Sequence, residues 1–577
     1  MKKNPAFRRS LLSLLLAMAM LLSMVACGTD PATEPSKNME GTTRPSTAPT
    51  TLPVTTPTTV PTTAPTIAPT TRPTEPPKPE KEPLVYTLIQ EDVDLFYTLL
   101  TECETLSIAG VDMDAIEKAN EALDEQYAYL NEQYSIINIL QCCDIYDKDL
   151  KDQFLECVEI CTQANDAYIQ MARRIYLSDT PVKDELFEGW TDQDIAQLLS
   201  YDEEIAKLNA RNEAITVEYR SAAKDSIAIA LYIEFVQNNN KIAQFYGYDN
   251  YYDYAFDLVY DRDYAPEDLQ LMRQYGKQYL ASIFDTSMRN FYNTFYSLPQ
   301  AEQSYVIDFL EKDYNKVAKP FVSLYMESLP ESMAETMDQM LTMDSTFTSS
   351  RRAKAGAFTT MIGDRSYCYF GPGYGNCMTV IHEGGHYYSS RYASLNSIPL
   401  DLAEVHSQGN EWLFVHFLKD HMPSKQYTAL VNYRLYNDIT MTLIAMMVDE
   451  FEYLVYNTDV SNFDGEDFDA LMNSVIEQYF DLDYANQNLT DINAYWRMVV
   501  VDQPAYYISY AVSAISAMDL YNMAQTDYDQ ALASYMQLCE EPVLDAGFLG
   551  NLEAVGLSGP FDEDFYIELV EIINSRK

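Results

Sequence analysis

The chain has 577 residues, of which 38 are basic and 87 acidic, so its formal net charge is −49. A surface of this sign repels nucleic-acid phosphates and anionic lipid headgroups, which argues against nucleic-acid binding and against electrostatic docking on a membrane. Hydrophobic residues make up 47% of the chain, enough to bury the core of one large enzyme or of several average domains. The negative charge favours solubility, and the functional alternative is a mild preference for cationic substrates.

Residues 1–27 form a predicted targeting segment. A basic start precedes an apolar run over residues 11–25, which is shorter than the about 20 residues of a transmembrane helix. The run ends in SMVAC, which resembles a bacterial lipobox with Cys27 as the lipidated residue. An ordinary secretion signal with a chance cysteine is the alternative. We expect a lipid anchor at Cys27 and a location on the extracellular face of a bacterial cell membrane.

Residues 28–84 are rich in threonine and proline, and 14 of the 26 prolines lie between Pro31 and Pro83. Such a segment has too few core-forming residues to offset the entropy lost on folding. We expect an extended or disordered linker that holds the folded body away from the membrane.

The remainder, residues 85–577, shows apolar residues at intervals of three and four, which predicts amphipathic helices throughout. No long Gly/Pro linker interrupts it, so we expect one large all-α body that is a monomer, with its catalytic part at about residues 350–525. Eight further cysteines follow Cys27. Their even number permits disulfides outside the cytosol, but the connectivity stays open. Cys157 and Cys161 lie one helical turn apart and are expected to be core or bridge partners.

One stretch departs from the helical pattern. Residues 354–376, KAGAFTTMIGDRSYCYFGPGYGN, mix β-forming residues with glycines. This composition predicts a small hairpin or an edge strand, with a simple loop as the alternative. An edge strand could offer backbone groups to an extended peptide.

The motif HEGGH follows this stretch at residues 382–386. On a helix, residues four apart share a face, so His382 and His386 can direct imidazole nitrogens at one zinc ion. Glu383 would then hold and deprotonate a water molecule at the metal. All five histidines of the chain lie between His382 and His421, which strengthens the prediction of a metal site.

A carboxylate-rich segment, LDLAEVHSQGNEWLFVHFL, comes about twenty residues later. Glu404 is the predicted third zinc ligand, and Glu411, on the same helical face, is predicted to orient a ligand histidine. An ordinary surface carboxylate is the alternative for Glu404. Among the other histidines, we expect packing for His416 and exposure for His421. For His406 we expect a packed position, with an active-site contact as the alternative.

These residues resemble the oligoendopeptidase F and thimet oligopeptidase family. In that family the motif HExGH is followed by a glutamate that opens a segment of the form E-x-P/A-S-x-x-x-E, which Glu404, Ser407 and Glu411 match. The resemblance covers roughly residues 354–521. It implies a mainly α-helical body with a deep substrate channel, a small sheet beside the active site and one Zn²⁺ per chain.

The segment DQPAYYISYA also resembles the tyrosine-rich block of this family. A tyrosine hydroxyl near the metal can donate a hydrogen bond to the oxyanion of a tetrahedral intermediate. Tyr510 is the first candidate for this role, and Tyr507 or Tyr506 the second. The family usually carries a histidine shortly before this block, whereas this chain has no histidine after His421.

The sequence therefore predicts a zinc-dependent metalloendopeptidase that hydrolyses short peptides at the outer cell surface. One alternative is a helical zinc carboxypeptidase or dipeptidase, which can share the same ligand spacing. The other is a lipid-anchored peptide-binding protein with weakened catalysis, which the missing histidine motivates.

Overall fold

The computed structural model describes residues 81–190, 203–220, 222–393, 398–480, 503–543 and 546–576, together with residues 195, 198, 199, 497 and 499–501. The predicted lipobox with Cys27 and nearly all of the linker lie outside these residues. Within the described part of the chain, no helix is long and apolar enough to cross a membrane.

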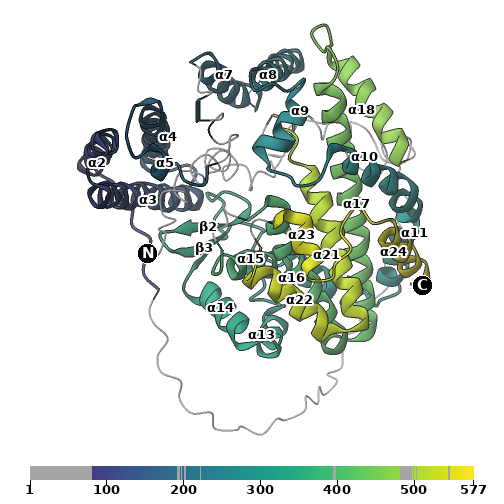
Figure 1. The fold of residues 1–577 in the computed structure, drawn as a ribbon. Coiled ribbons are helices and arrows are strands. Elements are labelled where there is room, and N and C mark those ends of the chain that lie inside the picture. The colour runs from purple at the N-terminus through teal and green to yellow at the C-terminus, as the bar shows by residue number, and fades with distance from the viewer. Residues whose placement is uncertain are drawn as a thin grey trace, which may run out of the picture.

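An N-terminal group of helices has a hydrophobic core of its own (Figure 1). It consists of α2 (Gln90–Ala109), α3 (Met113–Cys143), α4 (Lys148–Leu177) and α5 (Lys183–Leu186). The predicted period is visible in α2, where Phe96, Leu100 and Cys103 face inward and are buried. Asp112 begins α3 because its carboxylate accepts a hydrogen bond from the backbone N–H of Ala115.

A run of shorter helices connects this group to the sheet. It comprises α7 (Glu203–Arg220), α8 (Asp225–Phe245), α9 (Tyr251–Tyr254), the π-helix η1 (Ala255–Val259), α10 (Pro266–Tyr275), the π-helix η2 (Gly276–Leu280), α11 (Ala281–Tyr296), α12 (Gln300–Glu311), α13 (Lys319–Ser328) and α14 (Glu331–Thr342). The π-helix η1 is closed by a hydrogen bond of 2.9 Å from Tyr260 N to Ala255 O. Such wide turns often mark functional sites.

The predicted hairpin is present and belongs to a three-stranded sheet. Its strands are β1 (Ser345–Phe347), β2 (Ala357–Ile362) and β3 (Arg365–Phe370), in the order β1-β3-β2. β2 pairs antiparallel with β3, and β1 pairs parallel with it. The turn between β2 and β3 contains Gly363 with φ of 63°, a conformation that glycine adopts without penalty. Strand β2 is therefore an edge strand, as the sequence predicts.

The C-terminal helices form the largest core of the molecule. They are α15 (Cys377–Ser389), α16 (Leu400–His421), α17 (Ser424–Tyr456), α18 (Gly465–Tyr479), α21 (Ile508–Thr526), α22 (Tyr528–Glu540), α23 (Gly547–Ala554) and α24 (Glu563–Ser575). Helix α16 lies among α15, α21 and α22 (Figure 1). Its apolar residues from Trp412 to Val415 are all buried, because neighbours cover every face of the helix.

The N-terminal helices meet the rest of the molecule at the sheet. Ile136 and Ile139 of α3 pack in one cluster with Ile362 of β2 and Tyr369 of β3. The hydroxyl of Tyr369 donates a hydrogen bond of 2.9 Å to the backbone oxygen of Cys142. The sheet thus lies between α3 and the helix α15, which carries the HEGGH motif (Figure 1).

The predicted fold class, all-α with a small β-sheet beside the candidate site, is confirmed. The eight cysteines after Cys27 are all free thiols, and all but Cys143 are buried. Cys157 and Cys161 lie in the core of α2–α4. Of the two interpretations that the sequence left open, the structure therefore supports packing in the core and not a disulfide bridge.

Candidate metal centre

Helices α15 and α16 bring the three predicted ligands together. The ligand atoms of His382, His386 and Glu404 all lie within 4.8 Å of one another. Oε2 of Glu404 is 3.8 Å from Nε2 of His382 and 3.9 Å from Nε2 of His386. Ligand bonds of about 2.0–2.1 Å at tetrahedral angles give edges of about 3.3 Å. The two edges at Glu404, 3.8 and 3.9 Å, are wider than this, and the donor set of two imidazoles and one carboxylate fits zinc.

The close packing of α15 on α16 depends on Gly385. A Cβ atom at this position would lie 2.3 Å from the backbone oxygen of His406. The side chain of Asn410 also joins the two helices, because its Nδ2 donates a hydrogen bond of 2.7 Å to the backbone oxygen of Ile381. The HEGGH helix can therefore approach Glu404 only with a glycine at residue 385.

Glu411 occupies the predicted position behind a ligand histidine. Its Oε1 lies 2.8 Å from Nδ1 of His382, which leaves Nε2 of that ring to face Glu404 and His386. The guanidinium of Arg434 donates to Oε2 of Glu411 at 2.6 Å and to Asp438 at 3.0 Å. Burial would raise the pKa of Glu411, but Arg434 and His382 hold it below its ordinary value. Glu411 is thus an anion that fixes the His382 ring.

The two ligand histidines differ in their electrostatic surroundings. Burial lowers the pKa of His386 well below its ordinary value, and neighbouring His382 and His406 lower it further. Burial also opposes protonation of His382, but its hydrogen bond with Glu411 raises its pKa to about 9 in the metal-free chain. Buried Glu404 has a raised pKa, and the Ser407 hydroxyl donates to its Oε2 at 3.2 Å.

Glu383 lies between the ligand helix and the sheet. Its Oε2 accepts a hydrogen bond of 2.6 Å from the hydroxyl of Thr359 on edge strand β2. Burial raises the pKa of Glu383 to about 7 in the metal-free chain, against the opposing effects of His382 and Thr359. A carboxyl group with a pKa near neutrality can both accept and return a proton.

Three of these contacts were not anticipated from the sequence: those made by Thr359, Arg434 and Asp438. Arg434 and Asp438 are four residues apart on α17, a spacing that is common on any helix. Thr359 lies in an ordinary alternating strand. The sequence carries no local signal for the Thr359–Glu383 or the Arg434–Glu411 contact, because the partners lie on separate elements.

The remaining histidines are not members of the ligand cluster. His406 is buried, and its Nε2 faces the backbone oxygen of Leu538 at 3.1 Å. His416 is half-buried and stacks on Tyr528 with ring centroids 5.0 Å apart. His421 is exposed. The structure therefore agrees with the packed or exposed positions expected for all three.

The tyrosine segment leads into α21, which packs along α16 in the same direction. Nε2 of Gln408 donates to the Ser513 hydroxyl at 3.1 Å, and further along both helices Trp412 packs on Tyr521 with centroids 4.3 Å apart. One turn before Gln408 is Glu404, and one turn before Ser513 is Tyr510. Glu404 and Tyr510 thus each lie one turn before the contact between Gln408 and Ser513.

Burial separates the three candidate tyrosines. Tyr506 is only 1% exposed and packs edge-on against Tyr260, with centroids 6.0 Å apart. Tyr507 and Tyr510 are only partly buried, and their rings contact each other edge-on with centroids 5.5 Å apart. A hydroxyl that acts on substrate must be reachable, which favours Tyr510 and Tyr507 over Tyr506.

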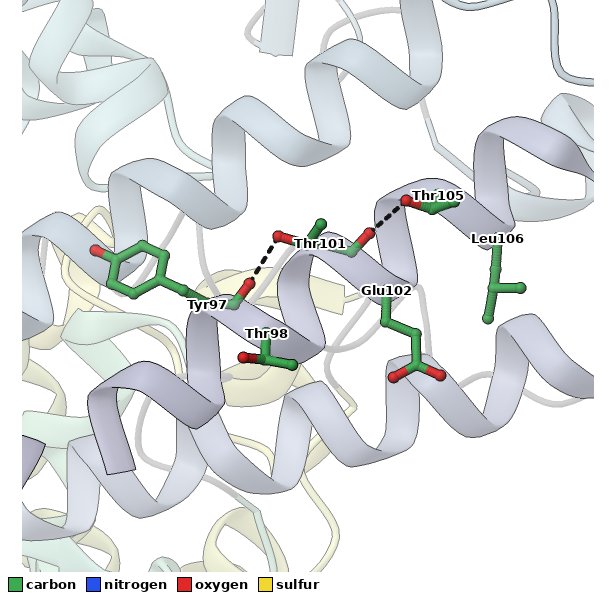
Figure 2. Close-up of a pocket in the computed structure, with 6 residues that line it drawn as sticks. All are labelled: Tyr97, Thr98, Thr101, Glu102, Thr105 and Leu106. Carbon is green, nitrogen blue, oxygen red and sulfur yellow. Dashed lines mark hydrogen bonds between the residues drawn. The ribbon is translucent and has the colours of Figure 1, made fainter. Parts of the chain in front are cut away.

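A pocket of about 550 Å³ lies elsewhere, on the outer face of α2 (Figure 2). The hydroxyls of Thr101 and Thr105 in its wall donate to backbone oxygens one turn earlier, both at 2.8 Å. Its lining brings no cluster of metal-ligating side chains together, and we assign it no part in the chemistry of the metal centre.

Comparison with known proteins finds similarity in fold. No family profile matches the chain, and no curated protein matches it in sequence. The structure of PZ peptidase A with an inhibitor superposes with a TM-score of 0.64 at 16% identity, covering 86% of this chain and 98% of that one. A candidate oligoendopeptidase F from Bacillus anthracis str. Ames gives a TM-score of 0.63 at 16% identity, covering 85% and 96%. At these identities the likeness establishes the shared fold.

Proposed function

We propose that this protein is a zinc-dependent metalloendopeptidase that hydrolyses short peptides. The observation that carries the proposal is the convergence of His382, His386 and Glu404 on one point, with Glu383 beside them. A catalytic zinc site needs three protein ligands and one open position, which this set provides. The fold shared with solved peptidase structures supports the same function.

Each role in a zinc peptidase mechanism can be given to a residue with suitable surroundings. Zinc in such a site supplies Lewis acidity toward the peptide carbonyl and the attacking water. Glu383 removes a proton from that water and returns it to the leaving amine, while Thr359 holds its carboxylate in place. Glu411, itself held by Arg434, keeps the His382 ring oriented. Tyr510, or Tyr507 beside it, donates a hydrogen bond to the oxyanion.

The edge strand β2 supplies a means of binding an extended substrate. Its side chains alternate, so that Thr359 faces Glu383 while Thr360 contacts Ser135 of α3. Among the described residues, β2 is paired along one edge, with β3. A peptide that adds to the other edge in extended form would align its carbonyl groups beside Glu383. The channel that the family resemblance implies would admit short peptides and exclude folded proteins.

We further propose that the enzyme acts as a monomer at the outer cell surface, anchored by lipid at Cys27. The support is the lipobox-like sequence and the Thr/Pro-rich linker that follows it. Labelling of cells with a radioactive fatty acid should mark the wild type and not Cys27→Ala, and the variant should appear in the medium. Absence of label on the wild type, or equal label on Cys27→Ala, would overturn the anchor.

The decisive experiment uses a library of short internally quenched peptides. Zinc-loaded wild type should cleave it, a chelator should abolish cleavage, and zinc should restore it. Glu383→Gln should bind zinc but lose activity, whereas Glu450→Gln should remain active, because Glu450 pairs with Lys277 away from the site. Absence of cleavage by the wild type would favour the peptide-binding alternative. Persistent cleavage by Glu383→Gln would overturn the assigned mechanism.

Peptides blocked at both ends separate the enzyme classes. An endopeptidase cleaves them internally, and mass spectrometry locates the bond. A carboxypeptidase needs a free C-terminus and leaves them intact. Cleavage restricted to unblocked peptides would therefore favour the exopeptidase alternative.

A further inference from the structure

Two non-glycine residues with left-handed backbone occur in the described part of the chain, and they lie at one junction. Asp261 has φ of 46° and Ala505 has φ of 62°. Such conformations are costly for residues with a side chain and persist only where their surroundings hold them. Asp261 follows the π-helix η1, and Ala505 precedes the tyrosines of the candidate site. Arg262, next to Asp261, makes the contact between the two segments.

The turn at Ala505 is held by three side chains. Nη2 of Arg262 donates to the backbone oxygen of Ala505 at 3.1 Å, and Oε1 of Glu452 accepts from its backbone N–H at 3.1 Å. The hydroxyl of Tyr260 donates to the backbone oxygen of Pro504 at 2.8 Å. The backbone polar groups of this turn are thus bound by side chains from two other parts of the chain.

The same guanidinium reaches both helices of the candidate site. Its Nη2 also donates to the hydroxyl of Ser509 on α21 at 3.0 Å. Its Nε lies 3.8 Å from Oδ2 of Asp401, in the first turn of α16 and one turn before Glu404. Arg262 therefore bridges the helix that carries the metal-ligand glutamate and the segment that carries the tyrosines.

This bridge is deeply buried. The Arg262 side chain is 1% exposed, and its guanidinium carbon lies 4.6 Å from the centre of the Tyr260 ring. Tyr264 donates to Asp401 at 2.7 Å and so completes the surroundings of the ion pair. A buried ion pair is a poor source of stability compared with apolar packing of the same volume. The ion pair of Arg262 therefore matters for the positions of the segments that it joins.

We propose that Arg262 is a positioning residue, which keeps the tyrosine segment in register with Glu404 so that tyrosine and metal act on the same carbonyl. This rests on the proposed peptidase function. Arg262 contacts Asp401, Ser509 and the backbone oxygen of Ala505, and it acts through the strained turn at Ala505. Loss of the bridge should free that turn while leaving the three metal ligands in place.

The test compares Arg262→Met with Arg273→Met. Arg273 is a matched control, because it is also buried and paired, with Asp449 at 3.1 Å, but reaches neither α16 nor residues 504–509. Arg262→Met should lower kcat roughly 10- to 100-fold with KM and zinc content unchanged, the scale expected for a misplaced catalytic group. Arg273→Met should match the wild type in kcat per folded molecule. Equal kcat in the two variants would overturn the proposal.

A second substitution tests the strained turn itself. Glycine adopts left-handed backbone without the penalty that alanine has. Ala505→Gly added to Arg262→Met should therefore restore kcat by about fivefold, whereas further loss would overturn the proposed action through this turn. If Arg262→Met does not fold, Arg262→Lys decides, because a lysine cannot reach all three partners; unchanged kcat would then refute the proposal.

Hydrogen exchange gives a readout that does not depend on activity. Residues 503–510 should exchange faster in Arg262→Met than in Arg273→Met, and the helix carrying His382 and His386 should exchange alike in both. Equal exchange of residues 503–510 would overturn the positioning role even if the wild type cleaves no peptide. Failure of the peptidase function and failure of this inference are therefore distinguishable.

Discussion

Substitution of Glu411 by glutamine should weaken zinc binding without removing a ligand. In the structure Oε1 of Glu411 lies 2.8 Å from Nδ1 of His382, and Arg434 holds the other carboxylate oxygen at 2.6 Å. Glutamine has nearly the same shape and can still accept a hydrogen bond from the ring. It lacks the negative charge that makes His382 a better metal ligand, and its NH2 group cannot accept the hydrogen bond from Arg434, so the substitution removes the charge and the Arg434 contact together.

The expected size follows from the role of such partners in zinc sites. Loss of a group that orients and polarises a ligand histidine costs about 10- to 100-fold in metal affinity. That range corresponds to about 1.4–2.7 kcal/mol at 25 °C. Glu411→Gln should lie toward the lower end, because the hydrogen bond survives. Arg434 keeps Asp438 as a partner at 3.0 Å, so the buried guanidinium is not left without an anion.

The assay is competition for zinc against a chromophoric chelator, with unfolding of the metal-free proteins measured in parallel. Asp438→Asn is the matched control: it removes the other anion beside Arg434 but has no contact with His382 in the structure. It should change zinc affinity by less than about threefold, which is below the range expected for Glu411. Equal zinc affinity of Glu411→Gln and wild type, or a larger effect in Asp438→Asn, would refute the reasoning.

Three other substitutions test separate features. Gly385→Ala should lower the melting temperature and the zinc content, because its Cβ would meet the α16 backbone at 2.3 Å, whereas at Gly384 the nearest atom is a flexible methionine methyl at 3.1 Å. Thr359→Val should lower kcat about tenfold at unchanged zinc content, because Glu383 loses its hydrogen bond. Asp519→Asn should raise the free energy of unfolding by about 1–2 kcal/mol at pH 7.5 and change it little at pH 4, because burial raises the pKa of Asp519 to about 6.

The sign of the last effect follows from proton binding. The folded state holds a proton on Asp519 up to about pH 6, whereas the unfolded chain releases it near its ordinary value of 3.8. Wild-type stability from this group is therefore present below about pH 4 and is lost as the pH rises to about 6. Asparagine can still accept the hydrogen bond of 2.7 Å from the backbone N–H of Ser558. A variant that is equally destabilised at pH 4 and 7.5 would contradict this account.

Outcomes for the other two substitutions are equally specific. Gly384→Ala serves as the control for Gly385→Ala. Similar melting temperatures of the two variants would show that the packing of α15 on α16 does not require glycine at residue 385. For Thr359→Val, an unchanged kcat would mean that Glu383 is held without the hydroxyl. A fall in zinc content would mean that the strand supports the ligands and not the base.

Much of this protein could be predicted from short stretches of sequence. The spacing of His382, Glu383 and His386 is read directly from helix geometry, and the strand-forming residues before it indicate the hairpin that the structure contains. The position of Glu404 and the glycine at residue 385 could also be read from short sequence motifs. These features are local, because helical and strand periodicities are properties of residues that are near neighbours in the chain.

Other features were decided only when distant segments packed together. Thr359 meets Glu383 because β2 lies beside α15, and Arg434 meets Glu411 because α17 lies beside α16. Burial separated Tyr506 from the partly exposed Tyr507 and Tyr510. Arg262 joins segments that no periodicity links, and its contact depends on two strained turns. The sequence by itself determined the helices, the hairpin and the candidate metal ligands. The tertiary structure decided what holds them, since side-chain contacts between distant segments are set by packing and leave no local pattern.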